Sequence, residues 1–208
     1  MNGLSKMSVA LHLFNTDEGA EKLPEEKGRL FHHLVAKLLY LCWRTRQDIQ
    51  TAVAFLCTRV QAPNVDDYKK LVKVMQCLCG TRHLTFTIEP GGDNNPNMWV
   101  DSSYAVHPDM RSQSGIIMTL GKGAAYTAST KQKINTKSST EPELVTINDS
   151  TAQVLWMRHF LASQGLHVPT MTIYQENKST ILLAENGKTS SSRRTKHLDI
   201  RYFFVTIC

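Results

Sequence analysis

The chain has 208 residues and a formal net charge of +6 at pH 7. This length, with 41% hydrophobic residues, allows one large domain or two small ones with a packed core. The five cysteines are odd in number and lack the spacing of zinc ligands, which argues against a disulfide framework and fits a reducing compartment. We find no signal peptide and no apolar run of bilayer length, so we expect an intracellular protein (cytoplasmic or nuclear) without a membrane partner.

The first part of the chain predicts a small helical unit that follows an arm. Residues 1–27 mix a few apolar residues with an acidic, polar run, which we interpret as an arm or loop. Leucines recur at helical spacing from Arg29 to Trp43. Two further amphipathic helices follow, with Asp48 as a candidate cap of one and Asn64 as the expected N-cap of the other. The predicted helical unit covers residues 28–90.

The second part, residues 91–208, has the pattern of an α/β domain. Alternating apolar residues predict a strand at His83–Ile88, and a loop rich in Gly, Asn and Pro at 90–97 separates the two parts. We then expect strands at 97–101, 114–120, 124–129 and 171–174, a long helix from 140 to Gly165, a helix through 181–183, and a last helix at 197–207. Three strands, a helix, a strand and a helix make an α/β order.

Three carboxylates stand at the ends of predicted elements of this domain. Asp101 follows its first strand, Glu143 opens the long helix, and Glu176 follows the fourth strand. Ligands of α/β sheets gather beyond the carboxyl ends of strands, and converging carboxylates suit magnesium.

Each carboxylate also has a structural interpretation. Asp101 could serve a turn or cap, and Glu176 could stabilise the N-terminus of the next helix. Glu143 lies three residues after Thr140, which is the spacing of a capping box. Residue spacing alone leaves both interpretations open.

Several short segments, taken in their order along the chain, resemble one known family. In the first part they are residues 38–41 (LLYL), 46–49 (RQDI) and 80–81 (GT). In the second part they are 100–101 (VD), 111–115 (RSQSG), 131–133 (KQK), 137–144 (KSSTEPEL), 173–179 (IYQENKS) and 194–202 (RTKHLDIRY). Residues from about 28 to 205 are in this respect similar to the end of a copia-type retrotransposon polyprotein, where the tail of reverse transcriptase precedes an RNase H domain.

The resemblance implies a fold and a chemistry. The fold is an α/β, RNase H-like mixed sheet with flanking helices, truncated at its C-terminus and preceded by the helical unit. In the family, carboxylates bind two magnesium ions that activate water and stabilise the leaving oxygen while the RNA strand of an RNA–DNA hybrid is cut. By position, Asp101, Glu143 and Glu176 are the metal ligands and catalytic residues, with Glu143 rather than Glu141 as the helix ligand. The implied partners are an RNA–DNA hybrid and the rest of the retroelement polyprotein.

The resemblance also suggests residues that contact nucleic acid. Asn177 and Ser179 match neighbours of the third metal ligand. The basic segment that contains Lys131, Lys133 and Lys137 could contact phosphates of the hybrid by charge. For these lysines, a solvated loop is the alternative interpretation.

The chain also departs from the family's pattern. Glu176 stands where the family has aspartate, and a carboxylate displaced by about 1 Å in such a site can cost a factor of ~100 in rate. Lys178 stands where glutamine is common. The family's last strand and fourth carboxylate would lie beyond Cys208, and Asp199 does not match that carboxylate by position. We therefore expect weak or absent cleavage, and the alternative function is a non-catalytic nucleic-acid-binding remnant of the element.

The polymerase signature Tyr-x-Asp-Asp is absent from the sequence, so we expect no polymerase activity.

Overall fold

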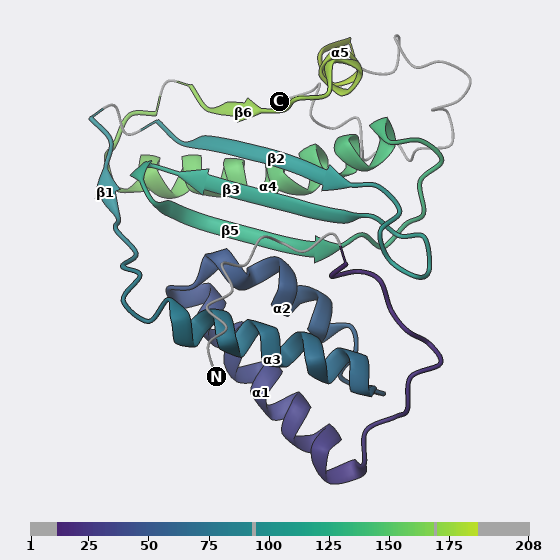
Figure 1. Cartoon of the computed structure of the whole chain (residues 1–208). Coiled ribbons are helices and arrows are strands. Elements are labelled where there is room, and N and C mark those ends of the chain that lie inside the picture. Colours follow the sequence, from purple (N-terminus) through teal and green to yellow (C-terminus); the bar gives the residue numbers. More distant parts are fainter. Residues whose placement is uncertain (1–11, 93–94, 169, 187–208) are drawn as a thin grey trace. The chain divides into compact units, whose positions relative to one another are not determined.

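The structure is a computed structural model that describes residues 12–92, 95–168 and 170–186 (Figure 1). The chain divides into two compact units, each with its own hydrophobic core. The first unit contains residues up to Phe86 together with the short segments 106–108 and 129–131, and the second contains the remainder. The predicted helix at 197–207 and Asp199 lie outside the described residues.

The first unit contains the helices expected from the sequence. They are α1 (Glu25–Arg44), the 3₁₀ helix η1 (Gln47–Ile49), α2 (Gln50–Cys57) and α3 (Val65–Gly80). Fully buried side chains from all four elements form the core: Phe31, Val35, Ile49, Val53, Phe55, Leu56 and Leu71. In α1 the buried face is formed by Phe31, Val35, Leu38 and Cys42, whereas Leu30 is exposed and Leu34 only partly buried, so the leucine spacing predicted the helix but not its buried face.

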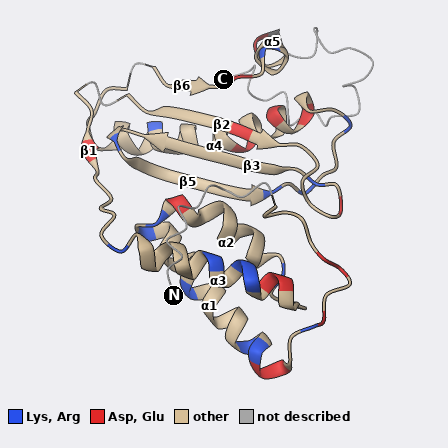
Figure 2. Ribbon diagram, in the orientation of Figure 1, with Lys and Arg blue, Asp and Glu red and all other residues tan. Residues whose placement is uncertain are grey.

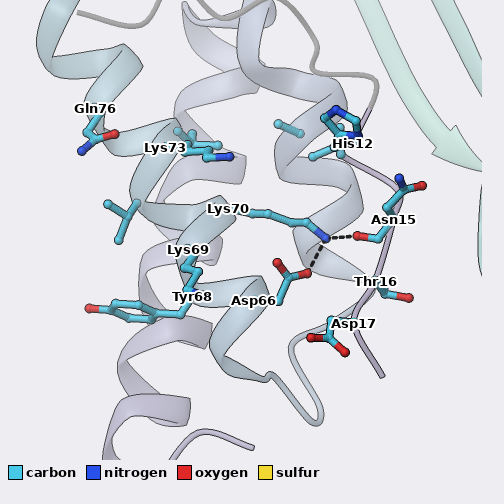
Figure 3. Close-up of a pocket in the computed structure, with 14 residues that line it drawn as sticks. His12, Asn15, Thr16, Asp17, Asp66, Tyr68, Lys69, Lys70, Lys73 and Gln76 are labelled. Atoms are coloured by element: carbon cyan, nitrogen blue, oxygen red, sulfur yellow. Dashed lines mark hydrogen bonds and ion pairs between the residues drawn. The ribbon is translucent and has the colours of Figure 1, made fainter. Parts of the chain in front are cut away.

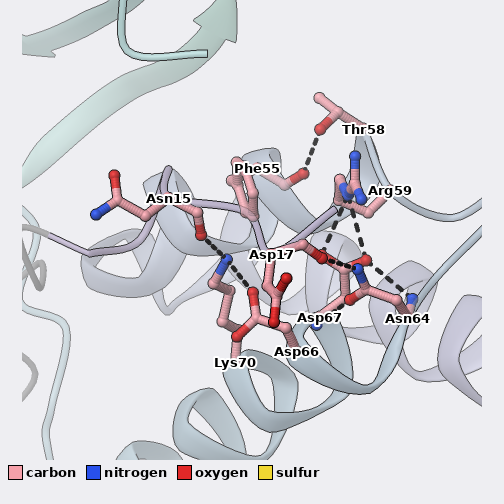
Figure 4. A network of polar contacts seen from close by, with 9 residues as sticks. All are labelled: Asn15, Asp17, Phe55, Thr58, Arg59, Asn64, Asp66, Asp67 and Lys70. Carbon is pink, nitrogen blue, oxygen red and sulfur yellow. Dashed lines mark hydrogen bonds and ion pairs between the residues drawn. The ribbon is translucent and has the colours of Figure 1, made fainter. Parts of the chain in front are cut away.

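The N-terminus of α3 is closed by the predicted cap. Asn64 Oδ1 accepts a hydrogen bond from the backbone nitrogen of Asp67 over 2.9 Å, and Asp67 Oδ2 accepts one from the backbone nitrogen of Asn64 over 3.0 Å. Arg59 Nε forms an ion pair with the fully buried Asp67 carboxylate at 3.1 Å. Figure 4 shows that this network extends to the arm, where Asn64 Nδ2 donates to the carbonyl oxygen of Asp17. The expected N-cap is confirmed.

The prediction that Asp48 caps the second helix is wrong. The N-cap of α2 is Ile49, and the Asp48 carboxylate instead accepts hydrogen bonds from Nε and Nη2 of Arg46, each over 2.8 Å. A charged two-point contact outcompetes the single backbone hydrogen bond that a cap would provide.

The second unit is built on a four-stranded mixed sheet in the order β5-β3-β2-β6 (Figure 1). Its strands are β2 (Asn97–Ser103), β3 (Gln113–Thr119), β5 (Ala124–Lys131) and β6 (Thr172–Tyr174). Strand β2 pairs antiparallel with β3 and parallel with β6. The sheet is flanked by α4 (Thr140–Ser163) and α5 (Lys178–Asn186). This arrangement confirms the α/β fold class, and it is consistent with the RNase H-like fold that the sequence predicts.

Alternation along β2 separates the core from the exposed face of the sheet. Met98 and Val100 are buried against α4, whereas Trp99 and Asp101 between and after them are exposed. Since successive side chains of a strand point to opposite faces, the same pattern brings apolar residues of β3 onto the core side. Helix α4 completes this core with Ile147, Val154, Met157 and Leu161.

The predicted strand at His83–Ile88 is wrong. Residues 84–88 have no regular secondary structure, and the strand of this region is the short β1 (Glu89–Pro90), which pairs with β4 (Gly121–Lys122). A β-carbon on Gly121 would lie 2.2 Å from the carbonyl oxygen of Glu89, so glycine permits this close pairing. Alternating residues form a strand only where a partner strand is available.

Within the described part of the chain, none of the helices is long and apolar enough to cross a bilayer.

Candidate functional site

Asp101 lies inside β2, two residues before the strand ends, rather than after it. Its side chain is exposed, and its Oδ1 accepts a hydrogen bond from the backbone nitrogen of Ser102 over 2.8 Å. The antiparallel partner of Asp101 in β3 is Gly115. The strand thus holds the backbone of Asp101 rigidly and leaves its carboxylate accessible.

Glu143 lies in the first turn of α4 and is only 8% exposed. The capping-box interpretation of Glu143 is wrong, because the N-cap of α4 is Ser139 and no side chain makes a capping hydrogen bond there. The Glu143 carboxylate instead accepts a hydrogen bond from the side-chain amide of Gln175, with 3.0 Å between Nε2 and Oε2. Glu143 therefore connects α4 to the segment that follows β6.

The structure brings Asp101 and Glu143 together. Burial raises the pKa of Glu143, the hydrogen bond from Gln175 lowers it, and the negative charge of Asp101 raises it. Figure 2 shows acidic residues, in red, at the start of α4. Two neighbouring carboxylates, one of them buried, repel each other in a way that a bound cation relieves, and their oxygen atoms are the ligands that Mg²⁺ prefers. This pair therefore fits a divalent cation.

Glu176 does not join this pair. Its side chain is exposed and lies beyond Tyr174, where β6 ends. Among the residues that the structure describes, no three His, Cys, Asp or Glu side chains lie close enough together to hold one metal ion. Of the three carboxylates expected at one site, Glu143 is buried, Asp101 and Glu176 are exposed, and in the described part of the chain the three do not form one metal-binding cluster.

Glu141 occupies a different environment from Glu143. It is 2% exposed, and its Oε2 accepts a hydrogen bond from the backbone nitrogen of Lys137 over 2.8 Å. This contact closes the loop that leads into α4. Glu141 therefore has a structural contact at the start of α4, whereas Glu143 contacts Gln175.

The residues expected to contact nucleic acid lie in three different settings. Lys131 is the last residue of β5 and is partly buried, whereas Lys133 and Lys137 are exposed in the segment between β5 and α4. Asn177 Oδ1 accepts a hydrogen bond from the backbone nitrogen of Thr180 over 3.1 Å, which satisfies a donor of the first turn of α5. Ser179 is exposed in the same turn. These contacts give Asn177 a structural position and leave Lys133, Lys137 and Ser179 accessible.

Sequence reasoning missed two glutamines at this end of the sheet. Besides Gln175, the buried Gln132 donates from Nε2 to Ser114 Oγ and to the carbonyl oxygen of Pro142, each over 2.9 Å. Gln132 thereby ties the segment after β5 to β3 and to α4. The signal that could have identified it was its place between two lysines in a segment already matched to the family.

The first unit contains a cavity of about 720 Å³ between the arm and α3 (Figure 3). Lys70 lies in it, paired with Asp66 at 2.9 Å and donating to the carbonyl oxygen of Asn15. Since protein groups already neutralise this buried charge, the cavity by itself defines no ligand.

Comparison with known proteins identifies relatives of this chain. The chain is 28% identical over 202 residues to the "Retrovirus-related Pol polyprotein from transposon TNT 1-94" of Nicotiana tabacum, covering 95% of the chain and 15% of that protein. It is 29% identical over 188 residues to the corresponding polyprotein from transposon RE2 of Arabidopsis thaliana, covering 88% of the chain and 12% of that protein. No family model and no solved structure matches the chain.

The homologues of this chain are therefore retrovirus-related Pol polyproteins from copia-type transposons, as the sequence predicts. The chain spans only 12% to 15% of the length of these relatives. It thus aligns with one part of these much longer polyproteins.

Proposed function

We propose that the second unit of this polyprotein fragment is an RNase H-like domain whose ancestral reaction is cleavage of the RNA strand of an RNA–DNA hybrid. We further propose that this cleavage is weak or lost in the present chain. The observation that carries both statements is the arrangement of the carboxylates. Asp101 and Glu143 are neighbours at one end of the sheet, and Glu176 is exposed apart from them.

Asp101 and Glu143 are the residues that would hold Mg²⁺ here, with Glu176 as the expected third ligand. Two bound ions would supply activation of the attacking water and stabilisation of the leaving oxygen. The protein's own contribution is to fix the two carboxylates: β2 holds the backbone of Asp101, and α4 holds that of Glu143. The electrostatic repulsion within this pair favours a cation over an empty site.

Weak activity follows from the position of Glu176. A third ligand would have to be ordered from an exposed position, and ordering a long side chain costs conformational entropy. Lys178, also exposed, places a positive charge two residues further on. Both features lower the affinity expected for a second ion.

The alternative function is a non-catalytic remnant that binds nucleic acid. The exposed Lys133 and Lys137 favour it, because their ammonium groups are accessible to phosphates. On this alternative, hybrid binding weakens steeply with salt and does not depend on magnesium. Changing Lys133 and Lys137 to alanine would reduce the slope of affinity against salt, whereas Asp101→Asn would leave binding intact.

The test of the proposed function is a cleavage assay with a labelled RNA–DNA hybrid and Mg²⁺. We expect no appreciable cleavage by this chain, and any residual cleavage should disappear in Asp101→Asn. Robust cleavage that Asp101→Asn abolishes would support the RNase H-like reaction and refute the proposal that this activity is lost. Robust cleavage that survives Asp101→Asn and Glu143→Gln would refute the assignment of the site.

A further inference from the structure

The side-chain amide of Gln175 is held at both of its ends. Its Nε2 donates to Glu143 Oε2 over 3.0 Å, and its Oε1 accepts from the backbone nitrogen of Asn177 over 2.9 Å. Reversing the amide would set its NH₂ group against a backbone N–H and its oxygen against a carboxylate. The two contacts therefore define one orientation of Gln175, in which it presents a donor to Glu143.

In the segment that follows β6, the side chain that contacts Glu143 is that of Gln175. Side-chain exposure alternates from Thr172 to Glu176, with Ile173 and Gln175 partly buried and their neighbours exposed. Ile173 packs on the core beneath α4, and Tyr174 stacks on Trp99 on the exposed face. Gln175 is thus partly buried and in contact with Glu143, whereas Glu176 is exposed.

The segment that carries Gln175 is anchored to the helix that carries Glu143. Asn177 Oδ1 accepts a hydrogen bond from the backbone nitrogen of Thr180, and Thr180 Oγ1 donates to the carbonyl oxygen of Thr140 over 3.3 Å. Thr140 is the first residue of α4. A closed series of contacts thus runs from Glu143 through Gln175, Asn177 and Thr180 back to the first turn of the same helix.

We infer that Gln175 is a positioning residue, which holds the Glu143 carboxylate beside Asp101 in the orientation that receives a divalent cation. This inference rests on the proposed function, since it concerns the same site. A flexible glutamate without a donor would sample several rotamers, and only some of them leave an oxygen directed at the cation. Donors that orient a metal-binding carboxylate typically change metal affinity by about 10- to 100-fold.

The experiment measures Mn²⁺ binding to the full chain by electron paramagnetic resonance, with Mg²⁺ as competitor. The variant Gln175→Met keeps an unbranched side chain of similar length and removes the donor, and Gln175→Leu serves as a second such variant. The matched control is Gln164→Met at the exposed C-cap of α4, at the opposite end of that helix from Glu143. Circular dichroism confirms that each variant is folded.

We expect the dissociation constant for Mn²⁺ to rise about tenfold in Gln175→Met and to stay within about twofold of the original in Gln164→Met. In the metal-free protein, the NMR signals of the Gln175 side-chain amide should shift in Glu143→Gln and remain in place in Glu141→Gln. If Gln175 had only a structural role, the loss of its donor would not weaken Mn²⁺ binding, even where its side-chain amide signal shifts in Glu143→Gln.

Two results would overturn the inference, and only the second would also overturn the proposed function. If Asp101→Asn abolishes Mn²⁺ binding while both Gln175 variants bind as the original does, Gln175 does not position Glu143 and the proposed function stands. If the original chain shows no Mn²⁺ binding that Asp101→Asn removes, the metal site of the proposed function fails and this inference fails with it.

Discussion

Arg46 Nη2 lies 2.6 Å from Oγ1 of Thr81, so a residue just after α1 is bonded to the residue just after α3. The same guanidinium donates to the carbonyl oxygen of Thr81 over 3.3 Å and forms the two-point contact with Asp48. The Arg46 side chain is 10% exposed. One buried arginine thus fixes the ends of two helices of the first unit.

Replacing Arg46 should destabilise the first unit. Arg46→Ala removes charge-assisted hydrogen bonds and leaves Asp48 and Thr81 without their donor, so we expect the free energy of unfolding to fall by about 2–3 kcal/mol. Arg46→Lys should recover only part of this loss, because an ammonium group cannot form the two-point contact. Urea unfolding measures both changes.

The control for this prediction is Arg29→Ala. Arg29 forms an ion pair with Glu25 on α1, but its side chain is 73% exposed, and such pairs contribute about 0.5 kcal/mol or less. Equal effects of Arg29→Ala and Arg46→Ala would contradict the role given to Arg46.

The same contact predicts how stability depends on pH. The hydrogen bonds from Arg46 are the largest influence that lowers the pKa of Asp48 below its ordinary value. A lowered pKa in the folded state contributes stability above the unfolded value of about 4, and this stability is lost as the pH falls through the folded value. The stability difference between the original protein and Arg46→Ala should therefore narrow below about pH 4. Unfolding curves at pH 7, 4 and 3 test this, and a difference that is constant with pH would refute it.

Substitutions of Glu143 and Glu141 should have different effects on metal binding and on stability. Glu143→Gln should weaken Mn²⁺ binding about tenfold and change the free energy of unfolding by about 1 kcal/mol or less, because it also removes the repulsion from Asp101. Glu141→Gln should leave Mn²⁺ binding nearly unchanged and cost about 1–3 kcal/mol, because the buried Glu141 carboxylate accepts the backbone N–H of Lys137. A metal titration and urea unfolding of both variants check the assignment. The reverse ranking in the titration would show that Glu141 is the ligand.

Two cysteines of the first unit should differ in reactivity. Burial is the main influence that raises the pKa of Cys42 to about 12, whereas Cys79 is exposed. Near neutral pH, the thiolate fraction of Cys42 is then roughly a thousandth of that of an ordinary cysteine. At pH 8, iodoacetamide should modify Cys79 in the native protein and should modify Cys42 only after urea is added. Peptide mapping by mass spectrometry resolves the two sites, and rapid native modification of Cys42 would mean that the core around α1 opens.

What the sequence by itself determined about this protein is its local structure and its relationship to known proteins. Helical periodicity identified α1, α2 and α3, and Asn64 caps α3 because the cap and its partner Asp67 are three residues apart. Gly165 was predicted to end the long helix and follows it with a positive φ of 76°. Short motifs in a fixed order also predicted the copia-type homologues. Each of these features depends on residues close together in the chain, or on order alone.

Only the tertiary structure decided which side chains meet. The sequence predicted that Asp48 caps α2. In the structure its carboxylate binds Arg46, whose side chain is also hydrogen-bonded to Thr81, 35 residues further on. A capping box was one interpretation of Glu143 from the sequence. In the structure its carboxylate instead accepts a hydrogen bond from Gln175, 32 residues further on. Glu176 was expected at the site and is exposed, and the neighbouring Gln175 is the residue that contacts Glu143. Propensity and spacing act within a few residues, whereas the Arg46–Thr81 contact depends on how α1 and α3 pack together and the Glu143–Gln175 contact depends on where β6 ends beside α4.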